Sequence, residues 1–142
     1  MFASYHFQRN VRFAETDASG FAYFDTYIRM MEETEYAFLR SRELRVVLND
    51  DKGIIGFPRI SVDIAVEKPL RYEDQAEIEL QLCEADGKHI VYEFQIEHGE
   101  ELAATGTFKV ACCRFPTGEN PYAILTPEFV LEKLIDENVS TP

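Results

Sequence analysis

The sequence has no long apolar run and few basic residues. It contains no stretch of about 18 uninterrupted apolar residues, the length that a membrane-spanning helix needs. Its first ten residues lack the continuous apolar segment of a signal peptide. Its 14 Lys and Arg stand against 26 Asp and Glu, a net charge of −12, which opposes attraction to nucleic-acid phosphates and to anionic bilayers. We therefore expect a cytoplasmic protein that neither binds nucleic acid nor inserts into a membrane.

Signatures of disulfides and metal sites are missing as well. The cysteines, Cys83, Cys112 and Cys113, are odd in number and show no CxxC spacing. The three histidines are scattered without the spacing of metal ligands. We expect buried free thiols and no metal site.

The remaining composition indicates one folded domain. The 142 residues are 46% hydrophobic, and a chain of this length can remove roughly 68–70% of its unfolded surface from water. The sequence has no internal repeat and no linker rich in Pro, Gly or Ser. A single domain over residues 1–142 follows.

Hydrophobic periodicity predicts the order of the elements. A partial alternation indicates a strand over Tyr5–Phe13, and helical spacing predicts one long helix over about Ala22–Arg40. A short helix is expected over Glu43–Asp50. Alternating apolar and polar residues then predict four strands, followed by a terminal helix with Thr126 as its N-cap and Pro127 as its first residue. The four strands are Ile60–Lys68, Gln75–Ala85, 90–97 and Leu102–Phe115.

This order favours an α+β fold. A sheet with one apolar face must bury that face, and the Ala22–Arg40 helix is the only predicted element long enough to cover it. We expect a curved antiparallel sheet wrapped around one long central helix.

An acidic loop joins the first strand to this helix. The strand ends at Glu15-Thr16-Asp17, and Gly20 leads into the helix, so that a carboxylate can lie beside the helix N-terminus. Free N–H groups in a first helical turn can stabilise negative charge on a carbonyl oxygen, while a nearby carboxylate activates water or attacks directly. On spacing alone, Asp17 is better explained as a loop carboxylate that caps the helix than as a catalytic group. Glu15 is expected to face solvent or to pair with Arg12.

The same stretch resembles a known family. Asp17-Ala18-Ser19-Gly20, with Tyr23, Tyr27 and Glu32, is similar to the 4-hydroxybenzoyl-CoA thioesterase family of the hotdog fold, in its D-x-x-G-x-x-[YH]-x-x-x-Y form. Later segments also resemble that family, so that the similarity spans roughly residues 5–115. These segments are Phe57-Pro58, Pro69–Asp74, Asp86–Lys88 and Glu101–Gly106.

The resemblance implies hydrolysis of an acyl-CoA thioester to a carboxylic acid and free CoA. It implies no metal or redox cofactor, coenzyme A being part of the substrate. It also implies sites formed across a dimer interface, in a homodimer or homotetramer. Joining two sheets edge to edge would cover an exposed edge strand in such an assembly.

Catalytic roles are carried over residue by residue. The resemblance places Asp17 at the catalytic carboxylate position, as a general base toward water or as a nucleophile through a mixed anhydride. The backbone amide of Phe24, or a neighbour in the first turn, would hold the thioester oxygen. Gly20 is either a turn glycine or an opening through which the thioester reaches the backbone. Many family members have His or Tyr where this chain has Phe24, but a backbone donor does not depend on the side chain.

Further residues are candidates for substrate binding. The aromatic side chains of Phe21, Tyr23 and Tyr27 are expected either in the core or along the acyl site. Arg59, Lys68 and Arg71 are the candidates for contact with the phosphates of coenzyme A.

Three other functions compete with hydrolysis. A non-catalytic acyl-CoA-binding or ligand-sensing module on the same fold is suggested by the departure at Phe24. A hydratase or dehydratase is disfavoured because no histidine lies near Asp17 in the sequence. An acyl-carrier-protein substrate is disfavoured by the negative charge of this chain, since carrier proteins are typically acidic too.

Overall fold

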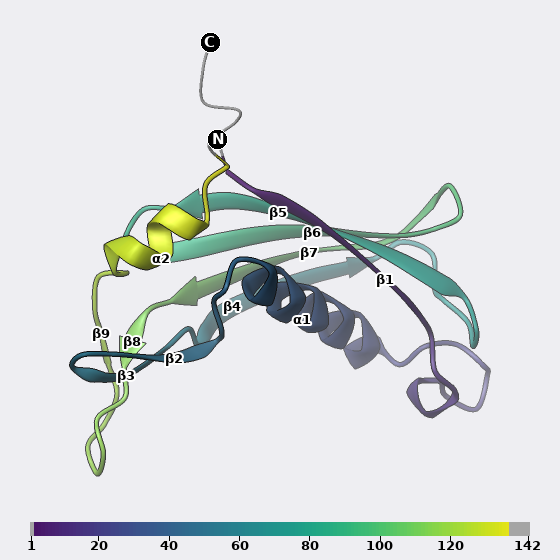
Figure 1. Ribbon diagram of the computed structural model, residues 1–142. Coiled ribbons are helices and arrows are strands. Elements are labelled where there is room, and N and C mark those ends of the chain that lie inside the picture. Colours follow the sequence, from purple (N-terminus) through teal and green to yellow (C-terminus); the bar gives the residue numbers. More distant parts are fainter. Residues whose placement is uncertain (1, 137–142) are drawn as a thin grey trace.

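A computed structural model describes residues 2–136 (Figure 1). One five-stranded antiparallel sheet has the strand order β1-β5-β6-β7-β4, and a smaller sheet has the order β2-β3-β8-β9. In chain order the elements are β1 (Ser4–Asn10), the 3-10 helix η1 (Phe13–Glu15), α1 (Phe24–Ser41), β2 (Val47–Asp50), β3 (Gly53–Gly56), β4 (Arg59–Val66), β5 (Gln75–Ala85), β6 (His89–His98), β7 (Glu101–Ala111), β8 (Cys113–Arg114), β9 (Tyr122–Ala123) and α2 (Glu128–Lys133).

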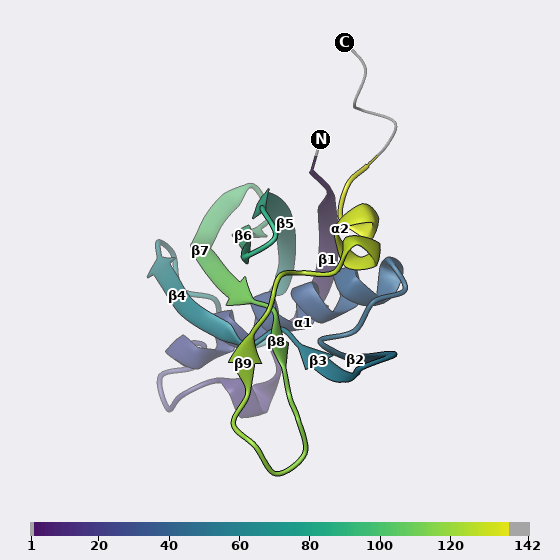
Figure 2. The same ribbon diagram turned by 90° about the vertical axis from the view of Figure 1, so that its left-hand side faces the viewer.

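The large sheet curves around α1, which lies in its concavity (Figure 2). Alternate residues of the central strands face the helix and are buried, among them Leu80 and Phe94, while the intervening Glu79 and Gln95 are exposed. Removing this apolar face from water is the main force that holds helix and sheet together. The expected α+β hotdog architecture is confirmed.

The helix α1 rests closely on the sheet at Gly106. Its buried face includes Tyr27, Met31 and Phe38, which recur at helical spacing. A Cβ atom at Gly106 of β7 would lie 2.5 Å from the sulfur of Met31, so a larger residue here would force the Met31 side chain to shift. The helix begins at Phe24, two residues later than predicted, after Tyr23 in an extended conformation.

The prediction of a short helix over Glu43–Asp50 is wrong. Glu43 has a φ of 59°, which interrupts helical backbone, and β2 then pairs with β3 in a tight antiparallel hairpin. The run Val46-Val47-Leu48 favours a strand because of its β-branched residues. The prediction gave too much weight to apolar spacing in a short segment.

Three element boundaries also differ from the predictions. Strand β1 stops at Asn10, because its pairing with β5 ends there, and Phe13 lies in η1. The predicted strand Leu102–Phe115 is interrupted at Cys112, which separates β7 from β8. Helix α2 begins at Glu128, after Pro127 rather than after Thr126.

The cysteines are free, as predicted, but only one of them is buried. Cys112 is buried, whereas Cys83 and Cys113 are half-buried. None of the helices in the described part of the chain combines the length and the apolar character needed to span a bilayer.

Candidate active site

The loop between η1 and α1 folds back on itself at Gly20. Thr16 and Ala22 form an antiparallel bridge. Within that bridge, the Asp17 N–H donates to the Phe21 carbonyl at 2.8 Å and the Gly20 N–H donates to the Asp17 carbonyl at 3.0 Å. Gly20 has a φ of 86° and open space beside its Cα atom. The turn therefore requires glycine for its backbone conformation, and the approach to the turn is unobstructed.

Backbone and hydroxyl groups of the loop hold the carboxylate of Asp17. Its Oδ1 accepts hydrogen bonds from the Ser19 N–H at 2.8 Å, from the Ser19 hydroxyl and from the Phe21 N–H at 3.3 Å. These bonds, the Ser19 hydroxyl first, hold the pKa of Asp17 below its ordinary value, because they favour the charged form. Residues 2–136 offer no hydrogen bond to the second oxygen, Oδ2.

The carbonyl of Glu15 anchors the start of α1 to this loop. It accepts the Tyr23 N–H at 2.8 Å and the Thr26 hydroxyl at 3.1 Å. Phe24 and Asp25 are the first two residues of α1, and N–H groups at that position have no intrahelical acceptor. In the described chain neither N–H meets another acceptor. Two amide donors therefore stand at the positive end of the α1 dipole, directly after the loop that carries Asp17.

A buried ion-pair cluster fixes the position of Glu15. The Arg9 guanidinium donates to both carboxylate oxygens of Glu15 and, through Nε, to Glu33 of α1 at 2.7 Å. The Arg12 N–H donates to Glu15 Oε1 at 2.9 Å. Despite burial, these bonds hold the pKa of Glu15 below its ordinary value. The expectation that Glu15 faces solvent or pairs with the Arg12 side chain is wrong, because the Arg9 side chain takes up its carboxylate.

Sequence reasoning missed this cluster, although one signal for it was present. Arg9 shares the inward side of β1 with Tyr5 and Phe7, and its side chain is only 8% exposed. An arginine in an inward register needs a buried carboxylate partner. The pattern of β1 alone does not say which carboxylate that is.

The turn between β4 and β5 packs against the Asp17 loop. The Ala22 N–H donates to the Leu70 carbonyl at 2.9 Å, and Phe21 forms an isolated bridge with Arg71. The Arg71 guanidinium lies over the Phe21 ring, 4.5 Å from its centroid. The Tyr27 hydroxyl accepts the Leu70 N–H at 2.9 Å. Two predicted substrate contacts, Phe21 and Arg71, are thus neighbours of Asp17 in the fold.

The three predicted aromatic contacts differ in exposure. Tyr23 is 50% exposed, Phe21 is half-buried, and Tyr27 is 2% exposed within the core. Burial raises the pKa of Tyr27. Tyr27 thus contacts the turn at Leu70 from within the core. By contrast, Tyr23 and the 58% exposed Phe24 present apolar surface at the start of α1.

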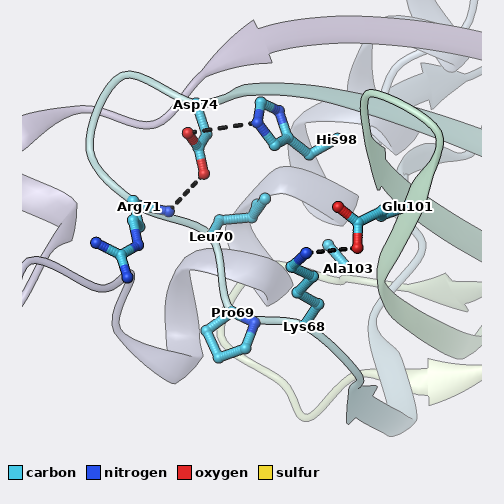
Figure 3. Close-up of a pocket in the computed structure, with 8 residues that line it drawn as sticks. All are labelled: Lys68, Pro69, Leu70, Arg71, Asp74, His98, Glu101 and Ala103. Atoms are coloured by element: carbon cyan, nitrogen blue, oxygen red, sulfur yellow. Dashed lines mark hydrogen bonds and ion pairs between the residues drawn. The ribbon is translucent and has the colours of Figure 1, made fainter.

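A cavity of about 280 Å³ adjoins this turn (Figure 3). Lys68 pairs with Glu101 across it, and His98 Nε2 lies 3.5 Å from Asp74 Oδ1. The Arg71 side chain points away from the Lys68–Glu101 pair (Figure 3). The complete lining is Lys68, Pro69, Leu70, Arg71, Asp74, His98, Glu101 and Ala103.

Arg59 contacts the middle of α1 rather than the Asp17 loop. Its guanidinium lies 2.6 Å from Glu35 Oε1 and 3.1 Å from Glu32 Oε2. It also lies over the rings of Tyr36 and Phe108. Contact between Arg59 and coenzyme A stays a prediction, and the charge of Arg59 has two carboxylate partners within the chain.

The site joins an ionised carboxylate with unpaired amides. Such an arrangement suits carbonyl chemistry, in which the amides stabilise charge on an oxygen and the carboxylate acts as base or nucleophile. Within residues 2–136, no three His, Cys, Asp or Glu side chains are grouped so that they could hold a metal ion.

Comparisons with known proteins find thioesterases. The model of the thioesterase-like superfamily matches residues 11–134. A 1,4-dihydroxy-2-naphthoyl-CoA hydrolase from Synechococcus elongatus is 30% identical over 105 residues, which cover 72% of this chain and 76% of that protein.

Solved structures share the fold. A 1,4-dihydroxy-2-naphthoyl-CoA thioesterase from Synechocystis superposes with a TM-score of 0.81 and 19% identity, over 96% of this chain and 98% of its own. A mutant 4-hydroxybenzoyl-CoA thioesterase, complexed with 4-hydroxybenzoyl-CoA, superposes with a TM-score of 0.79 and 16% identity, over 93% and 99% of the two chains.

Proposed function

This chain belongs to the thioesterase-like superfamily, and we propose that it hydrolyses the thioester of an acyl-CoA to a carboxylic acid and free coenzyme A. The single observation that carries the proposal is the junction of loop and helix. Asp17 has one carboxylate oxygen held by the loop and one oxygen without a partner among the described residues. The Glu15 carbonyl ties the same loop to the start of α1, where the Phe24 and Asp25 amides stand.

The amides act on the thioester carbonyl. In the proposed reaction its oxygen accepts the Phe24 N–H, with Asp25 as the neighbouring donor. Negative charge grows on this oxygen as the carbonyl carbon becomes tetrahedral, and a fixed donor stabilises that charge more than it stabilises the ground state. The helix dipole adds to the effect.

Asp17 supplies the second half of the reaction by one of two routes. As a general base, Oδ2 takes a proton from water while the water oxygen bonds to the carbonyl carbon, and the C–S bond then breaks to release the coenzyme A thiolate. As a nucleophile, Oδ2 bonds to the carbonyl carbon and expels the thiolate, leaving a mixed anhydride that water cleaves. In both routes the thiolate takes up a proton, and both require an ionised Asp17, which its lowered pKa favours at neutral pH.

Nearby side chains bind the remainder of the substrate. Phe21 and Tyr23 flank the loop and supply apolar surface to the acyl group, with Tyr27 behind them. Lys68 and Arg71 belong to the segment whose Leu70 and Arg71 contact the loop, and we propose them as contacts of the coenzyme A phosphates. Arg59 is the weaker candidate, since Glu32 and Glu35 already neutralise it.

We further propose that the chain forms a homodimer through β4, which pairs only with β7 within the described sheet. Ile60 is 54% exposed and Val62 is 41% exposed on this edge strand. A second β4 would pair with its free backbone groups and cover both side chains. Light scattering tests this: a Val62→Lys variant should be monomeric, and an unchanged dimer would contradict pairing along β4.

The catalytic proposal is tested by thiol release from short, long and aromatic acyl-CoA substrates. An Asp17→Asn variant should lose about 10²–10⁴-fold in kcat, because the amide is neither a base nor a nucleophile of comparable strength. Asp86→Asn is the matched control. Asp86 also accepts loop N–H groups, from Lys88 and His89 at 2.9 Å each, but it lies in the turn between β5 and β6.

Three results separate the alternatives. Loss of activity in Asp17→Asn with Asp86→Asn unaffected supports the catalytic role. Full activity in Asp17→Asn removes Asp17 from that role. Binding of acyl-CoA by the unaltered chain without any thiol release favours the non-catalytic binding module.

A further inference from the structure

We propose that Ser19 is a positioning residue for the reaction, holding Oδ1 of Asp17 so that Oδ2 is the oxygen that reacts. This assignment rests on the proposed function, because it concerns the carboxylate that would carry out hydrolysis. Ser19 lies two residues after Asp17, at the exposed tip of the turn that ends at Gly20.

The two carboxylate oxygens of Asp17 differ in the hydrogen bonds that they accept. Oδ1 accepts the Ser19 N–H at 2.8 Å, the Ser19 hydroxyl, and the Phe21 N–H at 3.3 Å. Both N–H donors belong to the backbone of the turn and remain after any side-chain change. The Ser19 hydroxyl is therefore the one donor on Oδ1 that a substitution can remove without altering the turn.

A hydroxyl has a single hydrogen to donate. At Ser19 this hydrogen is directed to Asp17, so that rotation of the carboxylate about its Cβ–Cγ bond would break the hydroxyl bond together with the two N–H bonds. Hydrogen bonds to Oδ1 also draw electron density toward that oxygen. The result is a carboxylate with a fixed orientation and one oxygen that remains available to substrate or water.

Neutral donors, rather than ion pairs, keep Asp17 ionised. The Ser19 hydroxyl is the largest cause of its lowered pKa. Charged groups on the adjoining elements have other partners: Glu15 of η1 pairs with Arg9, Asp25 of α1 pairs with Arg29 at 3.2 Å, and Arg71 lies over the Phe21 ring. None of these charges is among the causes of the lowered pKa.

The loop supplies a matched control for a serine variant. Thr16 carries a hydroxyl in the same turn, and this hydroxyl donates to the Phe13 carbonyl at 2.7 Å rather than to Asp17. Thr16→Val removes an exposed hydroxyl hydrogen bond from the same loop. Any effect that Ser19→Ala and Thr16→Val share arises from loosening of the loop, whereas an effect confined to Ser19→Ala arises at the carboxylate.

The experiment compares Ser19→Ala, Ser19→Thr and Thr16→Val with the unaltered chain. The pH dependence of kcat and KM is measured for one acyl-CoA that the unaltered chain hydrolyses, and the ¹³Cγ resonance of Asp17 is titrated by NMR. Ser19→Ala should lower kcat by about 3–30-fold, since hydrogen bonds to charged groups are the stronger ones. Its KM should change less than twofold. Its acid limb and the Asp17 resonance should both move to higher pH.

The same measurements show whether Ser19→Thr rescues the reaction and whether the proposed role of Ser19 fails. Ser19→Thr restores a hydroxyl and should restore kcat and the acid limb, while Thr16→Val should leave both as they are. An unchanged pH profile and an unshifted Asp17 resonance in Ser19→Ala would overturn the role of Ser19 while hydrolysis itself stands. Absence of thiol release from the unaltered chain would instead overturn the proposed function, and the reactive role of Ser19 with it. The NMR titration would still test the hydrogen bond.

Discussion

Each edge strand of the large sheet carries an arginine that pairs with glutamates, but the pKa of the buried glutamate is lowered at one edge and raised at the other. Arg9 on the edge strand β1 reaches Glu33 of α1 and Glu15, and Arg59 on the opposite edge strand β4 reaches Glu32 and Glu35 of α1. Each arginine thus fastens one edge of the sheet to the central helix.

The outcomes differ because Glu35 is more deeply buried than Glu15 and has fewer hydrogen bonds. Both oxygens of Glu15 are bonded, and its pKa is lowered. Glu35 is 1% exposed and one of its oxygens, Oε2, has no hydrogen-bond partner in the described chain. Its burial, only partly offset by Arg59, raises the pKa of Glu35 to about 7. At Glu35 one arginine does not offset the cost of burying the charge, whereas at Glu15 shallower burial and fuller hydrogen bonding favour the charged form.

The largest expected effect comes from breaking the fully bonded edge. Arg9→Met leaves the carboxylate of Glu15, whose side chain is 10% exposed, without its cation. Removing one partner of a buried pair costs about 3–5 kcal/mol in the free energy of unfolding, because the other charge stays buried. Urea unfolding at pH 7 measures this loss.

Arg59→Met is the matched variant on the other edge. Glu35 can take up a proton in response, so the expected loss is smaller, about 1–3 kcal/mol, and less at pH 6 than at pH 8. Equal losses for the two variants, independent of pH, would contradict the difference drawn between the edges.

An intermediate effect is expected from Glu35→Gln, which should change how the free energy of unfolding depends on pH. The raised pKa of Glu35 means that the folded state binds its proton more tightly than the unfolded state does. The contribution of Glu35 to stability is therefore fully present below its ordinary pKa of 4.5 and is lost as the pH rises through about 7. The unaltered chain should lose about 1–3 kcal/mol relative to Glu35→Gln over this interval.

Unfolding free energies of both proteins at several pH values between 4 and 8 provide the measurement. Glu15→Gln serves as the counterpart, and its difference from the unaltered chain should grow as the pH rises, because the pKa of Glu15 is lowered. Parallel pH curves for Glu35→Gln and the unaltered chain would show that the pKa of Glu35 is the same in the folded and the unfolded state, which would contradict its raised pKa.

The smallest effect on stability is expected from Lys68, which belongs to neither the Arg9 nor the Arg59 ion-pair cluster. The Lys68–Glu101 pair is exposed, with side-chain exposures of 59% and 63%, and such pairs contribute little. Lys68→Met should change the unfolding free energy by less than about 0.5 kcal/mol. If Lys68 contacts coenzyme A phosphates, the KM for acyl-CoA should rise in the same variant while kcat is kept. A large fall in melting temperature would show that this surface pair acts like the buried ones.

The sequence predicted the fold where a pattern extended over many residues. The long helix and the four later strands show periods that continue for eight residues or more, and only one helix was long enough to cover the sheet. The short β2 segment failed because its four residues do not distinguish a helix from a strand and its hairpin partner decides the outcome.

The residues of the candidate site could be proposed from the sequence, but the hydrogen bonds and ion pairs between them could not. Asp17, Gly20 and the start of α1 follow one another in the sequence, so their proximity was readable from chain order. The Arg9–Glu33 contact joins residues 24 positions apart, and it depends on how α1 lies across β1. Only the folded structure supplies that relation, and the same holds for the Ser19 hydroxyl, whose rotamer no sequence pattern specifies.

The contact of Met31 with Gly106 is made in the same rotational orientation of α1 as the two edge ion pairs. Successive residues of a helix are turned by about 100°, so a rotation of α1 by one residue would swing Glu33 away from Arg9 and Glu35 away from Arg59. The absence of a side chain at Gly106 accommodates Met31 in this orientation, and both arginine–glutamate pairs at the sheet edges depend on the same orientation of the helix.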